Sequence, residues 1–370
     1  MGILRRSHSA LLVKGLFAAL AISCLVGLYY GYRLMVSNEA SRYFGRTVEE
    51  RLQAIADDIA PIHVVVVTSN VRLGGAIAVM MSVTRHTRRP VRFHLVTDNA
   101  TKYHAYAWMH HPHLSGINYE VLTFPNEAID QTLFRTVDDS SASKLTFAKL
   151  YMTHLLPSVS GIVVQIDDDV IVQGDIGELA GLPISQDHVG LFSQDCDAVS
   201  RRYNSAGSKY SHYLNLDTAS LAGLHINPGA CVLNIGVFVI NMEEWKRQNI
   251  TAVVEHWMRV DQREKIFKQE GPLCPLLLAL YNKTTTLDPQ WHVRNLGVTT
   301  GSLYSRTYIE KAKLLQWSGH FKPWGTRASF ADIWYSYFVA DPTGRFRPSG
   351  KYSRISTTPS GSQPKVGYTR

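Results

Sequence analysis

Apolar and polar positions alternate regularly along the middle of the chain. From Pro61 to Ile166, short runs of β-branched residues are separated by stretches in which apolar residues recur at helical spacing. This pattern predicts strands at residues 63–68, 91–97, 118–122 and 162–166, and helices at residues 75–85, 102–110 and 146–156. Strands separated by helices of about ten residues are typical of βαβ units, which form a parallel sheet buried on both faces. The sequence therefore predicts an α/β fold with a mostly parallel, Rossmann-like sheet flanked by helices.

The C-terminal third has a different pattern. It is richer in Trp, Gly and Pro, and we expect it to fold over the sheet within a single domain at residues 61–346. Beyond Asp341-Pro342 the chain is basic, rich in Ser, Thr, Pro and Gly, and almost without apolar residues. Such a composition cannot bury a core, so we expect residues 347–370 to be a disordered tail.

Another hydrophobic pattern lies near the N-terminus. Residues 15–32 form an uninterrupted apolar run of 18 residues, which is just long enough to cross a bilayer as a helix. Three basic residues precede the run, so residues 1–14 are expected to stay cytoplasmic. A cleaved signal peptide is the alternative, but no small-x-small cleavage site follows the run. We therefore expect a transmembrane anchor at residues 15–32 and a stem at residues 33–60.

The distribution of charge argues against a nucleic acid polymer as partner. The formal net charge is +8, but residues 1–38 hold four basic residues and no acid, and residues 343–370 hold six and no acid. Removing these ten charges leaves about −2 for the part of the chain that is expected to fold. A basic stripe of the kind that contacts phosphate backbones is therefore not expected on the domain.

Two features agree with a secretory compartment. Three Asn-x-Thr triplets follow the predicted anchor and are candidate glycosylation sites, although such triplets also arise by chance; their asparagines are Asn99, Asn249 and Asn282. Three cysteines also follow the anchor, and in an oxidising compartment two of them could pair. The pairing we expect is Cys196–Cys231, which leaves Cys274 as a buried thiol.

The strongest chemical signal is the segment IVVQIDDDVIVQGDI at residues 162–176. Three consecutive carboxylates, Asp167 to Asp169, follow a predicted strand, and their mutual repulsion is costly unless a cation offsets it. An isolated acidic triplet is more often a solvated turn. Here apolar runs enclose the triplet on both sides, which favours a cation site at the edge of the sheet.

This segment resembles the metal-binding Asp-x-Asp region of glycosyltransferase family 8. Further segments are similar, in order, to those of the glycosyltransferase 8 domain-containing proteins of animals, and the resemblance covers roughly residues 62–346. They are LTFAKLY, LFSQDCD, NIGVFVINMEEWKRQNIT, LDPQWHVRNLG, KLLQWSGHFKPWG and ADPTGRF. The resemblance implies a GT-A fold and the retaining transfer of a sugar from a UDP-sugar, usually with Mn²⁺ or another divalent cation.

The resemblance also implies roles for individual residues. Asp167 and Asp169 match the metal-binding pair, and Asp168 matches a contact to the donor. Positions at the exit of the first strand match the uridine site: Val66, Thr68, Ser69 and Arg72. Neither G-x-G-x-x-G nor a P-loop motif occurs in this stretch, so dinucleotide and P-loop interpretations lose support.

Other matched positions concern the diphosphate and the transferred sugar. Lys149 matches a basic residue that faces the nucleotide, although a surface lysine is an equal alternative from the sequence alone. Gly319 and Lys322 match the clamp on the diphosphate, in which a lysine stabilises the charge of the leaving group. Asp195 and Asn234 match positions that face the acceptor or the donor sugar and are the candidate catalytic residues.

Two departures from the family pattern bear on activity. The histidine that completes the metal site in the family is replaced by Gln316, whose carbonyl can still bind a hard cation. The Asp-Gln pair that many members carry is replaced by Leu273 and Cys274, which leaves no evident covalent nucleophile. An active chain is then expected to use a front-face mechanism, in which the departing diphosphate helps to deprotonate the acceptor.

Together these features predict a metal-dependent, retaining glycosyltransferase. The anchor and triplets predict a single-pass type II protein of the Golgi or ER membrane, since a short span suits a thin membrane. The partners would be a UDP-sugar and a glycan, protein or lipid acceptor. The alternative is a lumenal protein that binds a nucleotide-sugar with weak or absent catalytic activity.

Overall fold

The computed structural model describes residues 20–32, 60–124, 133, 144–196, 209–301 and 303–350. It divides the chain into two compact units, Met1–Ala60 and Pro61–Arg370. Residues 20–32 are helical, and among the described residues no helix is both long and apolar enough to cross a membrane. Residues 15–19 of the predicted anchor, residues 33–59 of the predicted stem and residues 351–370 of the predicted tail lie outside the described residues.

The larger unit contains a seven-stranded sheet with the order β3-β2-β1-β4-β7-β6-β8. Its strands are β1 (Ile62–Val67), β2 (Val91–Thr97), β3 (Asn118–Thr123), β4 (Ile162–Asp167), β6 (Gly190–Gln194), β7 (Leu233–Asn241) and β8 (Thr284–Thr286). The first four strands are parallel, whereas β7 runs antiparallel to both β4 and β6. The four strands that the hydrophobic pattern predicts are all present, and the mostly parallel sheet is confirmed.

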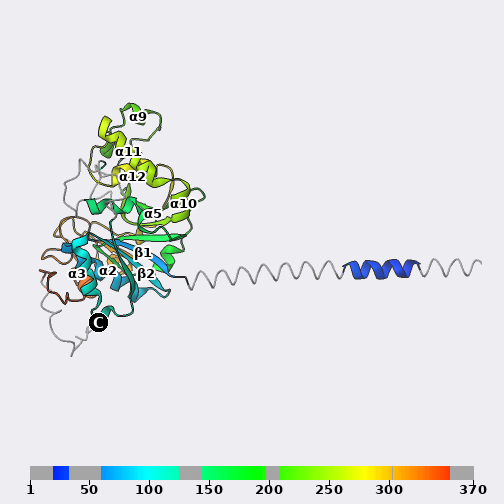
Figure 1. Cartoon of the computed structure of the whole chain (residues 1–370), viewed down its shortest axis with the longest axis horizontal. Coiled ribbons are helices and arrows are strands. Elements are labelled where there is room, and N and C mark those ends of the chain that lie inside the picture. The colour runs from blue at the N-terminus through cyan, green and yellow to red at the C-terminus, as the bar shows by residue number, and fades with distance from the viewer. Residues whose placement is uncertain are drawn as a thin grey trace, which may run out of the picture. The chain divides into compact units, whose positions relative to one another are not determined.

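Helices cover the sheet on both faces. They are α2 (Leu73–His86), α3 (Asn99–Met109), α5 (Met152–Leu155), α6 (Ile176–Ala180), α8 (Tyr210–Tyr213), α9 (Ala219–Ala222), α10 (Met242–Arg247), α11 (Ile250–Glu264), α12 (Leu273–Ala279), α13 (Arg306–Lys311) and α14 (Ala331–Tyr335). Figure 1 shows α2 and α3 toward one end of this unit and α11 and α12 toward the other, with the sheet between them. Four 3-10 turns also occur in the described part, among them η1 (Asn70–Arg72) and η4 (Thr146–Leu150).

Alternate residues of the strands pack into two separate cores. On β1, Val64 and Val66 belong to one hydrophobic cluster and Val65 to the other. The same alternation occurs on β7, where Val237 and Phe238 belong to different clusters. A strand that is apolar on both faces must be covered on both faces, which explains the continuous apolar runs in the sequence.

The topology places a ligand site at one edge of the sheet. The connections from β1 through β2 to β3 run in one direction, and the chain then returns to add β4 on the other side of β1. The strand order thus reverses between β1 and β4, and ligands in open α/β sheets bind at this point, beyond the carboxyl ends of the strands. Val67 and Asp167 are register partners there, so the residues that follow the two strands start side by side.

A small second sheet completes this edge. β5 (Val170–Val172) follows the acidic triplet directly and pairs antiparallel with β9 (Leu314–Gln316). In this register Val170 faces Gln316. Two residues that are far apart in sequence, Asp169 and Gln316, are therefore brought together by backbone pairing.

One predicted helix is wrong in form. Residues 146–156 fold as the 3-10 turn η4 and the short helix α5, separated at Tyr151, and not as one continuous helix. The carbonyl of Leu150 accepts a hydrogen bond from the Thr251 hydroxyl at 2.9 Å. This tertiary contact takes a carbonyl that a continuous helix would use in its own ladder.

The expected disulfide is confirmed. Cys196, after β6, is bonded to Cys231, before β7, with a Cα–Cα distance of 5.6 Å. The bridge fixes the ends of these two adjacent strands. Cys274 is a buried free thiol, also as expected.

Candidate functional site

A cavity of about 260 Å³ lies beyond the carboxyl ends of β1 and β4. It is lined by Val67, Thr68, Ser69, Arg72, Leu145, Thr146, Lys149, Asp167, Asp168 and Pro272. Six of these residues are among those that the sequence singles out: three follow β1, two end or follow β4, and Lys149 lies on η4. The fold thus gathers residues from three separate segments into one cavity.

Asp168 is the most enclosed of the three acids. Its side chain is 4% exposed and pairs with the guanidinium of Arg72, whose Nε lies 2.8 Å from Oδ1. The hydroxyl of Thr68 donates to Oδ2 at 2.9 Å. Asp168 therefore fixes the residues that follow β1, in addition to any contact it makes with a ligand.

The two flanking acids pair with two lysines. The ammonium of Lys149 contacts Asp167 and also donates to the carbonyl of Ile235 at 2.9 Å. The ammonium of Lys322 contacts Asp169 and donates to the carbonyl of Trp317 at 2.9 Å. With Arg72 on Asp168, each carboxylate thus has its own cation, and the six formal charges cancel.

Burial and charge act against each other on these groups. Burial alone would raise the pKa of Asp169, but Lys322 and Arg72 outweigh it and hold that pKa below its ordinary value. Burial alone would lower the pKa of Arg72, but Asp168, Asp169 and Asp167 raise that pKa well above its ordinary value. Asp169 and Arg72 are therefore charged at neutral pH.

Gln316 lies between the outer carboxylates. Its Nε2 is 3.3 Å from Oδ2 of Asp167 and 3.0 Å from Oδ1 of Asp169, so the two acids converge on one point. Its Oε1 lies 2.7 Å from Nε2 of His292, and the other ring nitrogen of His292 pairs with the Ser193 hydroxyl. All three of these polar side chains are buried.

This arrangement fits a hard divalent cation in its donor set. Two carboxylates and one side-chain amide converge, and oxygen donors of this kind suit Mg²⁺ and Mn²⁺. The amide of Gln316 points its nitrogen toward the acids, so its oxygen can become a ligand only after the amide rotates. Within the described residues no cluster of three or more His, Cys, Asp or Glu side chains could hold a metal.

Asp195, which follows β6, and Asn234, at the start of β7, lie together. Nδ2 of Asn234 donates to Oδ1 of Asp195 at 3.1 Å. Arg294, which the sequence analysis did not single out, places its Nε 2.9 Å from the same oxygen, and its side chain is only 3% exposed. Asn234 is linked to the acidic triplet through the next residue, Ile235, whose carbonyl holds Lys149.

Sequence signals for the missed residues existed but were indirect. Arg294 and His292 both lie in the segment LDPQWHVRNLG, where the family resemblance was noted without a role for either residue. Gln165 interrupts the apolar run of β4, donates to Asp167 at 3.1 Å, and has a buried oxygen without a hydrogen-bond partner in the described structure. A polar residue inside a buried strand is such a signal, because burial of an amide requires a partner.

Some predicted residues lie outside the cavity. Val66 is buried in the core at 1% exposure, and the next residue, Val67, lines the cavity instead. Gly319 has a φ of +105°, and an added Cβ would lie 2.5 Å from the carbonyl oxygen of Gly297. Its need for glycine thus follows from a close approach of two loops.

The three candidate glycosylation sites, Asn99, Asn249 and Asn282, are all exposed, as glycosylation requires.

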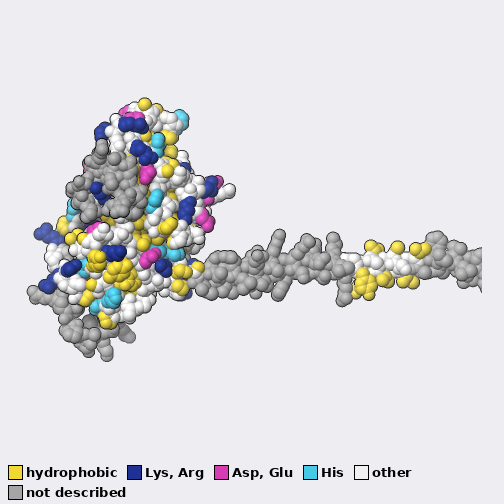
Figure 2. Space-filling model, in the orientation of Figure 1, with side chains coloured by type: hydrophobic (Ala, Val, Ile, Leu, Met, Phe, Trp, Pro, Cys, Tyr) yellow, Lys and Arg dark blue, Asp and Glu magenta, His cyan; other side chains and the backbone are white. Residues whose placement is uncertain are grey.

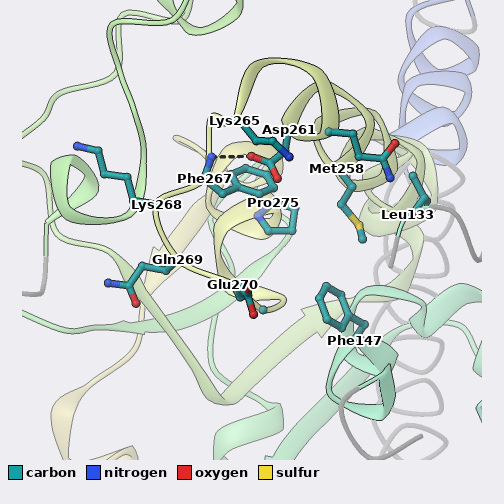
Figure 3. Close-up of a pocket in the computed structure, with 12 residues that line it drawn as sticks. Leu133, Phe147, Met258, Asp261, Lys265, Phe267, Lys268, Gln269, Glu270 and Pro275 are labelled. Atoms are coloured by element: carbon teal, nitrogen blue, oxygen red, sulfur yellow. Dashed lines mark hydrogen bonds between the residues drawn. The ribbon is translucent and has the colours of Figure 1, made fainter. Parts of the chain in front are cut away.

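A second cavity of about 300 Å³ lies on the other side of η4. Phe147 and Gly271 line it, whereas their chain neighbours Thr146 and Pro272 line the first cavity. Figure 3 shows Met258 beside Leu133, with Lys268 and Gln269 on the opposite side. Asp261 accepts a hydrogen bond from the backbone N–H of Phe267 at 2.7 Å and so stabilises a loop. The converging charges lie at the first cavity, and we assign the chemistry there.

One face of the domain carries mixed charge. On the face shown in Figure 2, Lys and Arg side chains are interspersed with Asp and Glu and form no continuous basic stripe.

Sequence comparisons identify similar proteins. The sequence model of Glycosyl transferase family 8 matches residues 63–328. Glycosyltransferase 8 domain-containing protein 1 of Mus musculus is 40% identical over 294 residues, which are 77% of this chain and 79% of the mouse protein. The protein of the same name from Homo sapiens is 39% identical over 304 residues, 80% of this chain and 82% of the human protein. Glycosyltransferase 8 domain-containing protein 2 of Mus musculus is 35% identical over 298 residues.

Solved structures share the fold at low sequence identity. The galactosyltransferase LgtC, in complex with donor and acceptor sugar analogs, has a TM-score of 0.54 at 15% identity and covers 77% of this chain and 100% of its own. The bifunctional glycosyltransferase WbbM has a TM-score of 0.55 at 20% identity and covers 78% of this chain and 51% of its own. At this level of identity the likeness concerns the GT-A architecture alone.

Proposed function

Because the chain belongs to glycosyltransferase family 8, we propose that it transfers a sugar from a UDP-sugar, with retention at the anomeric carbon, to an acceptor in the Golgi or ER lumen. The observation that carries this proposal is the set of three acids, each paired with its own cation, beside a cavity at the point where the strand order reverses. A bound diphosphate can pair with these basic side chains in place of the acids, and a divalent cation can then bind the acids.

The nucleotide is proposed to lie against the residues that follow β1. Thr68, Ser69 and Arg72 line the cavity and are candidates to contact the base and ribose. The Arg72 side chain is 34% exposed, which leaves it accessible from the cavity. Asp168, held between Thr68 and Arg72, offers carboxylate oxygens for a hydroxyl of the donor.

The converging acids are proposed to hold a divalent cation such as Mn²⁺. Asp167 and Asp169 would bind it, with Gln316 as a third ligand after rotation of its amide. When bound, such a cation supplies Lewis-acid stabilisation of the leaving diphosphate. Family membership and the donor set support this assignment.

The lysines are proposed to stabilise the charge that develops on the diphosphate. Lys149 and Lys322 each hold a backbone carbonyl as well as an acid, so their ammonium groups stay near the site when the acids change partner. Charge accumulates on the leaving group as the glycosidic bond breaks, and fixed cations stabilise that state more than the ground state.

Asp195 and Asn234 are proposed to position the sugar and the acceptor hydroxyl. Asp195 is engaged on the same oxygen by Asn234 and Arg294, which fixes its orientation. Leu273 has no nucleophilic group, and the Cys274 thiol is buried, with a pKa raised to about 12 by burial, so it stays protonated and is a poor nucleophile. We propose front-face transfer, in which the departing diphosphate accepts the proton of the acceptor hydroxyl.

The location is proposed from the sequence. The apolar run of residues 15–32 would anchor the chain as a single-pass type II protein, with its domain in the lumen. Glycosylation at Asn99, Asn249 or Asn282 would follow. A shift in electrophoretic mobility on glycosidase treatment, lost when the three asparagines are replaced, tests this topology.

A second candidate function is nucleotide-sugar binding without turnover. It is favoured by one observation, that the oxygen of Gln316 faces His292 and is turned away from the acids. In this state the predicted metal site offers two carboxylates and an N–H donor. A weakly bound cation would leave binding intact and slow the transfer.

One experiment separates the two candidates. Full-length chain in detergent is incubated with a panel of UDP-sugars and Mn²⁺, and both UDP release and thermal stabilisation are measured. Release that is abolished in Lys322→Met, and retained in the half-buried control Lys313→Met, whose ammonium pairs with Glu178, supports the transferase. Stabilisation without release supports the binding protein, and the absence of both contradicts each candidate.

A further inference from the structure

A turn near the C-terminal end of the domain is organised by one buried carboxylate. We call residues 341–346 the C-terminal strap. The Asp341 side chain is 0% exposed and accepts hydrogen bonds from the backbone N–H groups of Thr343 at 2.8 Å and Phe346 at 2.7 Å. Burial alone would raise the pKa of Asp341, but these donors lower it. The strap is therefore folded around an ionised Asp341.

His104 joins the strap to the turn beside the cavity. Its Nε2 lies 2.9 Å from Oδ2 of Asp341, and its Nδ1 lies 2.5 Å from Oδ1 of Asn70. The side chains of His104 and Asp341 are both fully buried. Asn70 is the first residue of η1, which continues to Arg72. Asn70 is itself exposed, so the cost of breaking its bond falls on the buried nitrogen of His104, which would lose this partner. This cost favours the observed position of η1.

Two aromatic rings, Phe346 of the strap and Trp324, connect the strap to Arg72 by packing. The Phe346 ring lies against Gly74, where an added Cβ would be 2.2 Å from Cε1 of the ring. The Phe346 ring centroid is 6.1 Å from that of Trp324. The Trp324 ring in turn carries the guanidinium carbon of Arg72 at 5.6 Å from its centroid, a cation–π geometry. Arg72 is thus held by Trp324 on one side and Asp168 on the other.

We infer that the C-terminal strap, acting through His104 and Asn70, is a positioning element of the nucleotide site. This inference rests on the proposed function, in which the nucleotide binds beside Ser69 and Arg72. None of the strap residues lines the cavity, so the strap acts by holding η1 in place. Nucleotide affinity should depend on it, whereas the lysines and Asp195 keep their own contacts.

Asn70 offers the cleanest test, because it lies outside both the strap and α3, so Asn70→Ala removes the bond to His104 and keeps every residue of the strap. The expected result is a Kd for UDP, measured by calorimetry with full-length chain and Mn²⁺, that rises about five- to tenfold. The KM for the donor should rise by a similar factor, with little change in kcat. Asn70→Asp keeps an oxygen opposite His104 and should restore most of the affinity.

A control variant separates positioning from general loss of stability. Asn241 caps α10 and accepts from the N–H of Glu243 at 2.9 Å, away from the cavity. Asn241→Ala should lower the melting temperature and leave the Kd for UDP unchanged. If Asn70→Ala binds UDP as tightly as the unaltered chain, the inference is wrong.

The inference can fail separately from the proposed function. If the unaltered chain does not bind UDP, the proposed function is contradicted, and hydrogen exchange of the amides of residues 69–75 then tests the strap alone. Faster exchange of these amides in Asn70→Ala than in the unaltered chain supports the strap as a positioning element. Equal exchange overturns it.

Discussion

The acids that end and follow β4 and the acid that lies beside β6 and β7 are paired with basic residues of different accessibility. At β1 and β4, three adjacent carboxylates pair with Arg72, Lys149 and Lys322, whose side chains are 34%, 10% and 20% exposed. At β6 and β7, one carboxylate, Asp195, pairs with Arg294, which is 3% exposed. Arg294 also donates to the backbone carbonyl of Gln194.

This difference indicates which contacts can exchange when a ligand binds. The cations at β1 and β4 are in part accessible, so they could turn from a carboxylate to a phosphate if a bound metal ion took their place on the buried carboxylates. Arg294 has no such freedom, because removal of a buried charge from its partner is costly. The first group thus has the exposure that exchange of partners requires, and the second fixes the orientation of a single acid.

The largest expected effect concerns the fixed pair. Arg294→Met leaves the Asp195 carboxylate without its buried partner, and we expect a loss of about 3 kcal/mol in the free energy of unfolding. Urea denaturation measures it, and Asp195→Asn in the same background should recover part of the loss. If Arg294→Met is as stable as the unaltered chain, Asp195 does not depend on this buried partner, and the contrast with the acidic triplet is lost.

The next effect concerns the exchangeable group. Asp169→Asn keeps the shape of the side chain and removes its charge, so UDP release in the presence of Mn²⁺ should fall about a hundredfold. Asp187, whose side chain is 72% exposed, provides the control, and Asp187→Asn should retain full activity. An Asp169→Asn chain with unchanged turnover would exclude a role for Asp169 in transfer.

The free energy of unfolding should depend on pH, with an effect of intermediate size, through three side chains on β1, β2 and β3. His63 faces His94, whose other nitrogen contacts Glu120. Burial is the main cause that lowers the pKa of His94, to about 4, and it also lowers the pKa of His63. The His94 ring is thus neutral in the folded state and takes up a proton on unfolding between about pH 6.5 and pH 4, and His63 adds an effect of the same sign.

The sign of this effect follows from proton uptake. The stability from the neutral rings is fully present above pH 6.5 and is lost as the pH falls toward 4, by about 2 kcal/mol at pH 5. Urea denaturation at pH 7.5, 6 and 5 measures the loss. His94→Gln should flatten the pH dependence, and replacement of the exposed His256 should not. The same slope in both variants would assign the effect to other groups.

The smallest effect tests the departure at the metal site. Gln316→His replaces an amide, whose oxygen faces His292, with an imidazole that can bind Mn²⁺ directly. We expect an affinity for Mn²⁺ about tenfold tighter by calorimetric titration. No tightening would show that the weakness attributed to Gln316 does not exist.

Much of the part of the sheet that borders the cavity, strands β1 to β4, could be predicted from the sequence. The parallel strands β1 to β4 and the acidic triplet follow from local hydrophobic periodicity, which is written in consecutive residues. The strands β6, β7 and β8, of which β7 is antiparallel to its neighbours, were not predicted, since their pairing joins segments far apart in the chain. The break at Tyr151 was missed because Thr251 competes for the Leu150 carbonyl.

The sequence by itself determined the alternating α/β pattern, the three acids after β4 and, by family resemblance, most of their partners. Only the tertiary structure decided which cation pairs with which acid and which way the Gln316 amide faces. It also decided that Arg294 pairs with Asp195 and that His104 joins Asn70 to Asp341. The physical reason is one of distance along the chain. Periodicity and motif act over a few residues, whereas Lys322 reaches Asp169, and Asp341 reaches Asn70 through His104, only after the sheet has formed.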